Sequence, residues 1–266
     1  MAPAETGTLR LRILSALALA PLPLVAIWLG GAFLWALTVV AAAVMAWEWS
    51  RLCGGGSGLI GVVALAVVAA AGAGFWVGVT LALVGALAVW GIEAQRPGGA
   101  PLWMAAGCLW VSLPCIILLW LAGSGTAGRT TLLWVFALVW ATDIGAYAVG
   151  RLLGGPRLAP RWSPRKTWTG LLGGVVCAAL AGWAVAGLLR AAPVLTIVLV
   201  SAGLAIVEQF GDLAESVAKR RFGVKDASSL IPGHGGLLDR LDGLLAVIPA
   251  VALLTWVGGG SVLTWP

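Results

Sequence analysis

The sequence predicts an all-α, polytopic integral membrane protein with about nine transmembrane helices and a cytoplasmic N-terminus. The 266-residue chain is 61% hydrophobic and only 10% charged, whereas soluble domains carry about 25% charged residues, so the bilayer must be its main solvent. Backbone polar groups in lipid need internal partners, which leaves helices or a closed barrel. The apolar runs are long and do not alternate with polar residues, which favours helices.

Each predicted span is a run of roughly twenty apolar residues, the length that crosses a bilayer as a helix. Arg10 and Arg12 precede the first run, as in a signal peptide, but the many later runs favour a retained first helix. The third and fourth spans are the shortest. The predicted spans are 11–29, 32–50, 58–74, 75–92, 101–121, 131–150, 169–189, 193–210 and 243–263.

The loops between these spans carry an uneven charge that predicts the orientation. With the N-terminus in the cytoplasm, fourteen of the sixteen Lys and Arg residues fall on the inner side, as the positive-inside rule requires. Nearly all acidic residues lie at the same edge. The chain is therefore divided into N-terminal transmembrane helices, 1–130, and a C-terminal catalytic region, 131–266, with cytoplasmic loops 151–168 and 211–242.

The stretch DASSLIPGHGGLLDRLD at 226–242 holds the only histidine and three of the ten acidic residues. Asp239 and Asp242 are three residues apart, on one face if helical. Two close carboxylates repel unless a cation lies between them, and carboxylates with phosphate oxygens suit Mg²⁺. The simpler interpretation is a cap for the following helix. Glycines nearby would let the backbone approach a ligand closely.

The segment EQFGDLAESVAKRR at 208–221 follows the eighth predicted span. If that helix continues out of the membrane, Glu208, Asp212, Glu215 or Ser216, and Lys219 share one face. A solvated helix end with internal ion pairs is the alternative. Its position just below the membrane favours a functional role for Asp212 and Lys219.

Two further segments carry candidate polar groups. In RLLGGPRLAPRWSPRKTWTG at 151–170, Ser163, Lys166 and Thr167 lie on a proline-rich loop before a helix and resemble an anion cradle. Asp143 and Tyr147 lie on one stripe of the sixth span with Arg151, four residues apart. An intramembrane acid indicates function by default, although a structural ion pair explains it nearly as well.

Together these segments resemble the phosphatidate cytidylyltransferase family, also called CDP-diacylglycerol synthases. The family signature S-x-x-K-R, K-D and H-G-G-x-x-D-R-x-D is present with its spacing, and the resemblance is strong over about 140–245. One position departs: Thr169 stands where the family usually has glutamate. The matching residues are Ser216, Lys219, Arg220, Lys225, Asp226, His234, Gly235, Gly236, Asp239, Arg240 and Asp242.

The resemblance implies that CTP and phosphatidic acid give CDP-diacylglycerol and pyrophosphate, with Mg²⁺. It also implies a metal site of Asp212, Asp239 and Asp242 with Lys219 beside them; a second cation, monovalent or divalent, stays open. These four residues form the predicted catalytic set. The predicted substrate-binding residues are Asp143, Tyr147, Ser163, Lys166, Thr167, Ser216, Arg220, Lys225, His234, Gly235, Gly236 and Arg240.

The expected partners are CTP, phosphatidic acid in the bilayer and the surrounding lipids, with a homodimer left open and no nucleic acid. The expected location is the cell (inner) membrane, with the active site on the cytoplasmic side. Three alternatives stay open: a CTP-dependent lipid kinase of the polyprenol or phytol type, a membrane transporter, and an inactive family member, suggested by Thr169.

Overall fold

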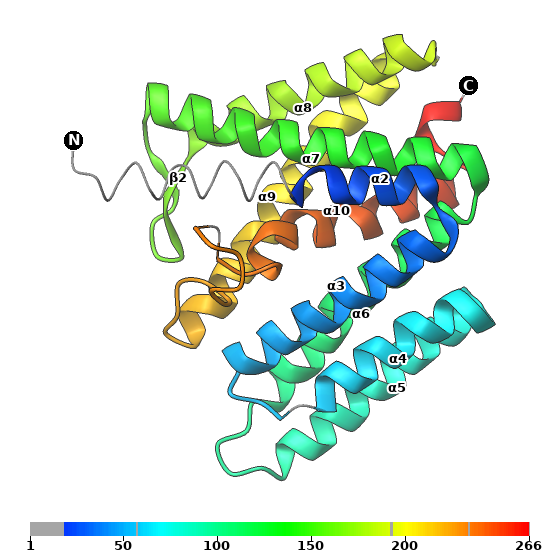
Figure 1. The fold of residues 1–266 in the computed structure, drawn as a ribbon. Coiled ribbons are helices and arrows are strands. Elements are labelled where there is room, and N and C mark those ends of the chain that lie inside the picture. The colour runs from blue at the N-terminus through cyan, green and yellow to red at the C-terminus, as the bar shows by residue number, and fades with distance from the viewer. Residues whose placement is uncertain (1–18, 57, 192–193, 234, 266) are drawn as a thin grey trace. The chain divides into compact units, whose positions relative to one another are not determined.

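The computed structural model describes residues 19–56, 58–191, 194–233 and 235–265, and it is almost entirely helical (Figure 1). A short hairpin, β1 (Arg157–Ala159) and β2 (Ser163–Thr167), interrupts the helices. The helices are α2 (Pro21–Leu29), α3 (Gly31–Leu52), α4 (Gly58–Ala73), α5 (Phe75–Ala94), α6 (Pro101–Ala122), α7 (Gly125–Leu153), α8 (Trp168–Leu189), α9 (Val194–Arg221), α10 (Leu238–Val257) and the 3₁₀ helix η1 (Val262–Thr264).

The helices confirm the prediction of an all-α, multi-pass membrane protein. Within the described residues, seven helices are long and apolar enough to cross a membrane: α3 and α5 to α10. The predicted span 58–74 is the shorter apolar helix α4, with 16 residues. The predicted span 11–29 is described only from its residue 19 onward, where α2 begins at Pro21. The count of nine therefore stays a prediction.

The chain forms two compact units. Unit 1 comprises Met1–Trp120 and Arg221–Leu241, and unit 2 comprises Leu121–Arg220 and Asp242–Pro266. The segment Arg221–Leu241 thus belongs with the N-terminal helices, although it is distant from them in sequence. The first turn of α10 lies in unit 1 and the remainder of that helix in unit 2.

Unit 1 is built from antiparallel helices that approach closely at small residues. A Cβ atom on Gly78 of α5 would lie 2.9 Å from the Ala66 carbonyl oxygen of α4, so glycine here allows the close approach that membrane helices use for packing. Figure 1 shows α4 and α5 side by side. The Trp49 indole of α3 donates to the Trp103 carbonyl of α6 at 2.8 Å.

Unit 2 is organised around the tight pair α7 and α8 (Figure 1). Where these helices meet, a Cβ atom on Gly173 would lie 2.4 Å from the Val149 side chain, and one on Gly145 would lie 2.7 Å from the Gly173 carbonyl oxygen. Glycine at these positions lets the two backbones touch. The Trp134 indole of α7 donates to the Ser201 hydroxyl of α9 at 3.0 Å, which ties the third helix to the pair.

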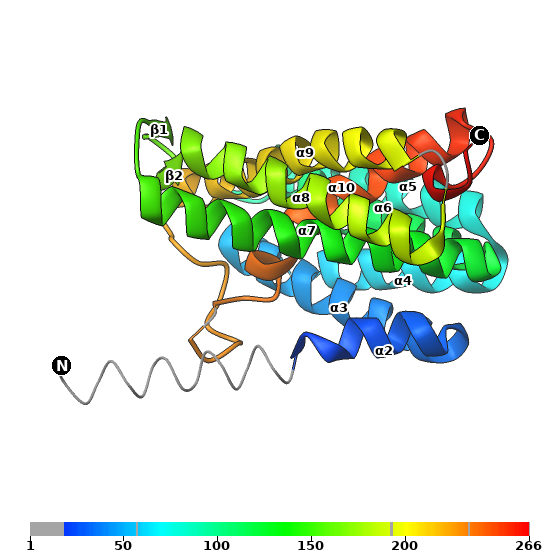
Figure 2. The ribbon, with the colours of Figure 1, turned by 90° about the horizontal axis from the view of Figure 1, so that it is seen from above.

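The hairpin between α7 and α8 occupies most of the segment that the sequence predicted as a loop at 151–168. Its strands are antiparallel, with Arg157 opposite Thr167 and Ala159 opposite Ser163. Pro160 and Pro164 exclude a helix here, and the turn lies between them. Figure 2 shows the hairpin at the ends of α7 and α8.

Helix α9 continues well beyond the predicted end of its span at residue 210. Its 28 residues give a length of about 42 Å, whereas the hydrocarbon core is about 30 Å thick. The stretch 208–221 is therefore helical, which is the condition under which its polar residues share one face. The non-helical part of the predicted loop 211–242 is limited to 222–237.

Candidate functional site

A chain of polar contacts in unit 2 joins the hairpin to α9. Lys166 of β2 lies with its ammonium nitrogen 2.6 Å from Asp212 Oδ2, and it donates to Gln209 Oε1 at 2.9 Å. The Gln209 amide in turn donates to Glu208 Oε2 at 2.7 Å. Asp143 of α7 also interacts with the Glu208 carboxyl. Three elements distant in sequence therefore contribute to one polar network.

The same face of α9 carries a second group of charges one turn further along. Lys219 pairs with the buried carboxylate of Glu215 at 3.3 Å. The Ser216 hydroxyl is 3.4 Å from Asp212 Oδ1. Asp242 of α10 interacts electrostatically with Glu215, Asp212 and Lys219. Asp212, Lys219 and Asp242, three of the four predicted catalytic residues, are thus neighbours in unit 2.

Two glycines allow α9 and α10 to approach closely at this point. A Cβ atom on Gly211 of α9 would lie 2.8 Å from the Asp242 carbonyl oxygen, and one on Gly243 of α10 would lie 2.7 Å from the Glu208 side chain. Any larger residue would push the helices apart. Close contact between the backbones is therefore what brings Asp242 up to the charged face of α9.

The composition of the network suits a hard divalent cation. Its carboxylates outnumber its ammonium groups, and a cation would offset their mutual repulsion. Its ligand atoms are oxygens, the type that Mg²⁺ prefers together with phosphate oxygens and water. Among the described residues no three His, Cys, Asp or Glu side chains are already close enough to hold a metal ion. The carboxylates are Asp143, Glu208, Asp212, Glu215 and Asp242, and the ammonium groups are Lys166 and Lys219.

The glycine-rich segment before α10 is held by two carboxylates within unit 1. Asp239 Oδ2 accepts the Ala227 and Gly236 amides at 2.9 and 2.8 Å. Glu48 of α3 accepts the Ser228 hydroxyl at 2.5 Å and the Leu237 and Leu238 amides at 2.9 and 2.7 Å. Asp239 therefore combines a capping role with its place one turn before Asp242 on α10.

The glycines of this segment have different tasks. Gly233 and Gly235 have φ values of 77° and 82°, a region that favours glycine. Gly236 is required for another reason, since a Cβ atom there would lie 2.5 Å from Glu48 Oε1. His234 lies outside the described residues. Lys225, just before this segment, and Arg240, in the first turn of α10, are both exposed.

Three other predicted substrate-binding residues form hydrogen bonds within unit 2. Thr167 caps α8 by accepting the Gly170 amide at 3.1 Å. Tyr147 pairs with Arg151, whose guanidinium donates to the phenol oxygen at 2.9 Å on an exposed face of α7. Arg220 donates to the Trp162 carbonyl at 3.2 Å. Ser163 occupies the start of β2.

Thr169, where the sequence departs from the usual glutamate, has a defined place. Its hydroxyl donates to the Gly154 carbonyl at the end of α7, and it is 3.0 Å from the Thr167 hydroxyl. It therefore links the end of α7 to the first turn of α8. The threonine here stabilises the base of the hairpin that carries Lys166.

Sequence reasoning did not single out Glu48 or Gln209 as site residues, and it offered Glu215 only as an alternative to Ser216 on the shared face of 208–221. Gln209 and Glu215 lie within the polar stretch 208–221, and their burial separates them from solvated neighbours. Glu48 offered one signal in the sequence, because it is the only acid in the apolar helix α3. The structure shows that its side chain is completely buried.

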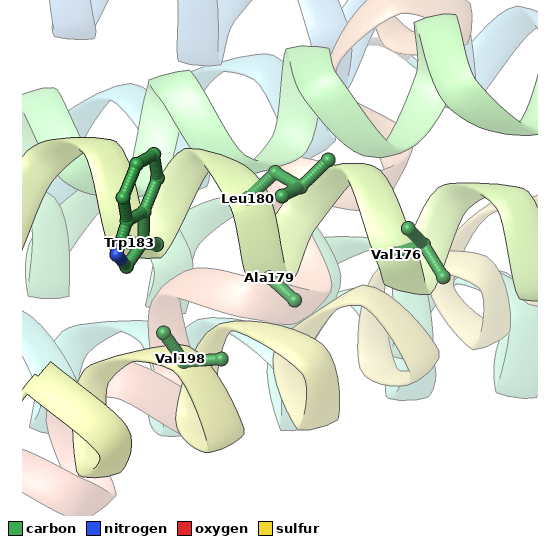
Figure 3. A pocket seen from close by; sticks show the side chains of 5 residues that line it. All are labelled: Val176, Ala179, Leu180, Trp183 and Val198. Carbon is green, nitrogen blue, oxygen red and sulfur yellow. The ribbon is translucent and has the colours of Figure 1, made fainter.

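An apolar groove of about 430 Å³ lies between α8 and α9 (Figure 3), lined by Val176, Ala179, Leu180, Trp183 and Val198. On α9, ten residues separate Val198 from Glu208, about 15 Å along the helix. The groove is therefore distinct from the polar network.

Comparison with known proteins places this arrangement in a family context. Residues 10–257 match the Cytidylyltransferase family. A phosphatidate cytidylyltransferase of Brucella suis is 39% identical over 267 residues, covering 95% of this chain and 94% of the relative. One from Pseudomonas aeruginosa is 37% identical over 269 residues, covering 94% and 98% of the two chains.

Proposed function

The chain belongs to the Cytidylyltransferase family, and on this basis we propose that it transfers the cytidylyl group of CTP to phosphatidic acid. The products are CDP-diacylglycerol, a precursor for phospholipid synthesis, and pyrophosphate. The observation that carries the proposal is full-length similarity to phosphatidate cytidylyltransferases. The network of carboxylates and lysines in unit 2 supplies the chemistry that this reaction needs.

The reaction requires charge neutralisation more than proton transfer. An oxygen of the lipid phosphate forms a bond to the α-phosphorus of CTP, and the bond from that phosphorus to the β-phosphate bridging oxygen breaks, releasing pyrophosphate. A phosphomonoester has a second pKa of about 6, so the nucleophile is largely dianionic at pH 7. The difficulty is repulsion between two polyanions, which fixed cations relieve.

Asp212 and Asp242 are the proposed Mg²⁺ ligands, and Asp239 is the third on the strength of its place one turn before Asp242. A bound Mg²⁺ would supply positive charge to the α-phosphate and the leaving pyrophosphate. The oxygen-only set of side chains fits this ion. A second cation, monovalent or divalent, is proposed as an addition to this set.

The two lysines, of which Lys219 is buried and Lys166 half-buried, have complementary tasks. Lys166, on the hairpin, contacts both Asp212 and Gln209 and would turn toward a nucleotide phosphate. Lys219, paired with Glu215, offsets the charge of Asp242. Ser163 and Thr167 would contact the CTP phosphates, while Lys225 and Arg240 would meet the lipid phosphate or pyrophosphate.

The remaining predicted substrate-binding residues lie on α7, on α9 and in the glycine-rich segment. Asp143 and Tyr147 on α7, with Ser216 and Arg220 on α9, would border the bound substrates. Gly235 and Gly236, with His234, would shape the segment that leads into α10. A homodimer is the proposed assembly.

The proposed topology is nine spans with the N-terminus in the cytoplasm. The charge bias of the loops supports it. In this orientation the hairpin and the C-terminal end of α9 face the cytoplasm, where CTP is available, while phosphatidic acid arrives from the bilayer. The proposed location is the bacterial inner membrane, in keeping with the bacterial relatives.

A lipid kinase that uses CTP would instead transfer the γ-phosphoryl group and release CDP. The names of the full-length relatives favour cytidylyl transfer. A transporter would place its polar site near the bilayer midplane, whereas the network here extends to the end of α9 beyond the predicted span.

The test is to supply purified protein in vesicles with CTP, Mg²⁺ and phosphatidic acid, and to measure the released phosphate compound together with the lipid mass. Pyrophosphate and CDP-diacylglycerol support the proposal. Release of CDP would identify a kinase, and nucleotide-independent solute flux without lipid product would identify a transporter.

A further inference from the structure

We propose that Glu48, a buried acid of a transmembrane helix in the N-terminal unit, is a positioning residue for the reaction. It fixes the glycine-rich segment 226–238 and thereby the first turn of α10. This inference rests on the proposed function for its consequence, but the contact itself lies entirely within unit 1.

Glu48 uses both carboxylate oxygens on this segment. Oε1 accepts the Ser228 hydroxyl and the Leu237 amide, at 2.5 and 2.9 Å, and Oε2 accepts the Leu238 amide at 2.7 Å. The side chain is completely buried. The carboxylate thus bridges residues on both sides of the glycine cluster.

The two amides bound by Glu48 are orphan donors at the start of a helix. The first amides of an α-helix have no partner within the helix, and α10 begins at Leu238. A negative charge at this end is also favoured by the helix dipole. Glu48 therefore caps α10 from another helix, a task usually performed by a residue of the helix itself.

The contact stabilises both partners, because the segment supplies the hydrogen bonds that the buried Glu48 carboxylate needs. A buried carboxylate without hydrogen bonds is strongly unfavourable, and three donors from the segment satisfy it. Gly236 leaves the room for this arrangement, since a Cβ atom there would lie 2.5 Å from Glu48 Oε1. The glycine and the glutamate are therefore matched.

A second contact within unit 1 holds the chain just before this segment. The Phe222 ring packs edge-on against Trp103 of α6, with centroids 5.7 Å apart. Trp103 is itself joined to α3, because its carbonyl accepts the Trp49 indole at 2.8 Å. Helix α6 thus holds the chain at Phe222, ahead of the segment, and α3 holds the segment itself through Glu48.

The consequence for catalysis passes through Asp239. Its Oδ2 accepts the Ala227 and Gly236 amides. Each of these residues directly precedes a residue that Glu48 binds. Freeing the segment would release those amides and the first turn of α10 together. The proposed metal ligand would then lose its fixed orientation, which typically lowers metal affinity or activity by about 10–100-fold.

The variants that test this are Glu48→Gln, Ser228→Ala and, as a matched control, Glu93→Gln. Glu93 is also a buried acid of unit 1, but it bonds the Gly56 amide and Arg96 instead. In Glu48→Gln the side-chain NH₂ would face the Leu237 N–H or the Leu238 N–H, depending on which oxygen it replaces, so at least one contact is lost. Ser228→Ala removes one donor to Glu48, together with the acceptor of the Leu230 amide, and leaves the carboxylate in place.

Each variant is purified into phosphatidate-containing phosphatidylcholine vesicles. Three quantities are measured: kcat, the Mg²⁺ concentration for half-maximal activity, and amide hydrogen exchange of peptides covering 226–238. We expect Glu48→Gln to lower kcat by about 10-fold or more, to raise the Mg²⁺ requirement and to speed exchange in this segment. Ser228→Ala should change all three in the same direction by less, and Glu93→Gln should leave them unchanged.

A merely structural role would reduce the active fraction without changing the Mg²⁺ requirement, and that result would overturn the proposal. Unchanged exchange and kinetics in Glu48→Gln would overturn it too. If the Glu48→Gln protein does not insert into the membrane, the Ser228→Ala variant decides. Unchanged amide hydrogen exchange of 226–238 in that variant would then overturn the proposal. Wild-type protein without cytidylyltransferase activity would refute the proposed function, while hydrogen exchange would still decide whether Glu48 fixes the segment.

Discussion

Lys166 of the β-hairpin and Asp212 of α9 form an ion pair of 2.6 Å that joins two segments more than forty residues apart in sequence. The pair brings a cation from the predicted nucleotide-binding loop to a predicted metal ligand. It also orients the hairpin on α9, because the same ammonium group donates to Gln209.

Replacing Lys166 should impair the reaction more than it impairs folding. We expect Lys166→Met to lower kcat/KM for CTP by about 10–100-fold, since it removes a cation beside the reacting phosphates and leaves Asp212 without its partner. Steady-state kinetics with varied CTP measure the effect. Arg165→Met, at the exposed neighbouring position, is the control and should stay near wild type; equal losses in both variants would assign the effect to general charge.

The glycine at 236 should not tolerate a methyl group. Gly236→Ala would force the Glu48 carboxylate away from its donors, which we expect to destabilise the protein by roughly 1–3 kcal/mol. Thermal unfolding in detergent checks this. Gly61→Ala on α4, where a Cβ atom meets nothing within 4 Å, should be neutral, and an equally stable Gly236→Ala protein would argue against the close contact.

The hydroxyl of Thr169 should matter more than its methyl group. Thr169→Val leaves the Gly154 carbonyl without this donor, at an expected cost of about 1–3 kcal/mol, whereas Thr169→Ser should be close to wild type. Unfolding temperature and activity together decide the point. If Thr169→Glu raises activity from zero, the chain is an inactive relative, contrary to the proposal.

Cys53, which follows α3, should be unreactive at ordinary pH. Burial, with a smaller contribution from the charge of Glu93, raises the pKa of its thiol to about 12. At pH 8 the thiolate fraction is then about 10⁻⁴. We expect maleimide to label Cys53 only after unfolding, as read by peptide mass spectrometry.

The direction of the pH effect follows from the same shift. The folded protein binds the proton of the Cys53 thiol more tightly than the unfolded chain does. The contribution of this proton to folding stability is therefore complete below the unfolded pKa of about 8.5. It declines as pH rises toward 12. Rapid labelling of the native protein at pH 8 would contradict the burial of the thiol.

Much of this architecture could be predicted from sequence because membrane helices are set by long apolar runs. The continuation of α9 to Arg221 was only a condition at the sequence level, under which Asp212, Ser216 and Lys219 share one face. The hairpin could not be predicted as strands, because its Pro160 and Pro164 indicate only that a helix is excluded. The strands form because Arg157 pairs with Thr167, and the prolines give no sign of that pairing.

The candidate site was predictable where charged residues lie close in sequence. Asp239 and Asp242 stood out for that reason. Glu48 did not, because its donors come from residues about 180 positions later, and one sequence contains no record of such a contact. The same holds for Gln209, whose role depends on a lysine from the hairpin.

In the proposed function, the carboxylates of α9 and α10 carry cytidylyl transfer. The most direct measurement compares wild type and Asp242→Asn in vesicles with phosphatidic acid, Mg²⁺ and CTP labelled at the α-phosphate, with Glu93→Gln as the buried-acid control. Labelled lipid should form with wild type and the control, and should fall by about 100-fold or more in inserted, folded Asp242→Asn protein. Labelled lipid at the wild-type rate in Asp242→Asn would contradict the account.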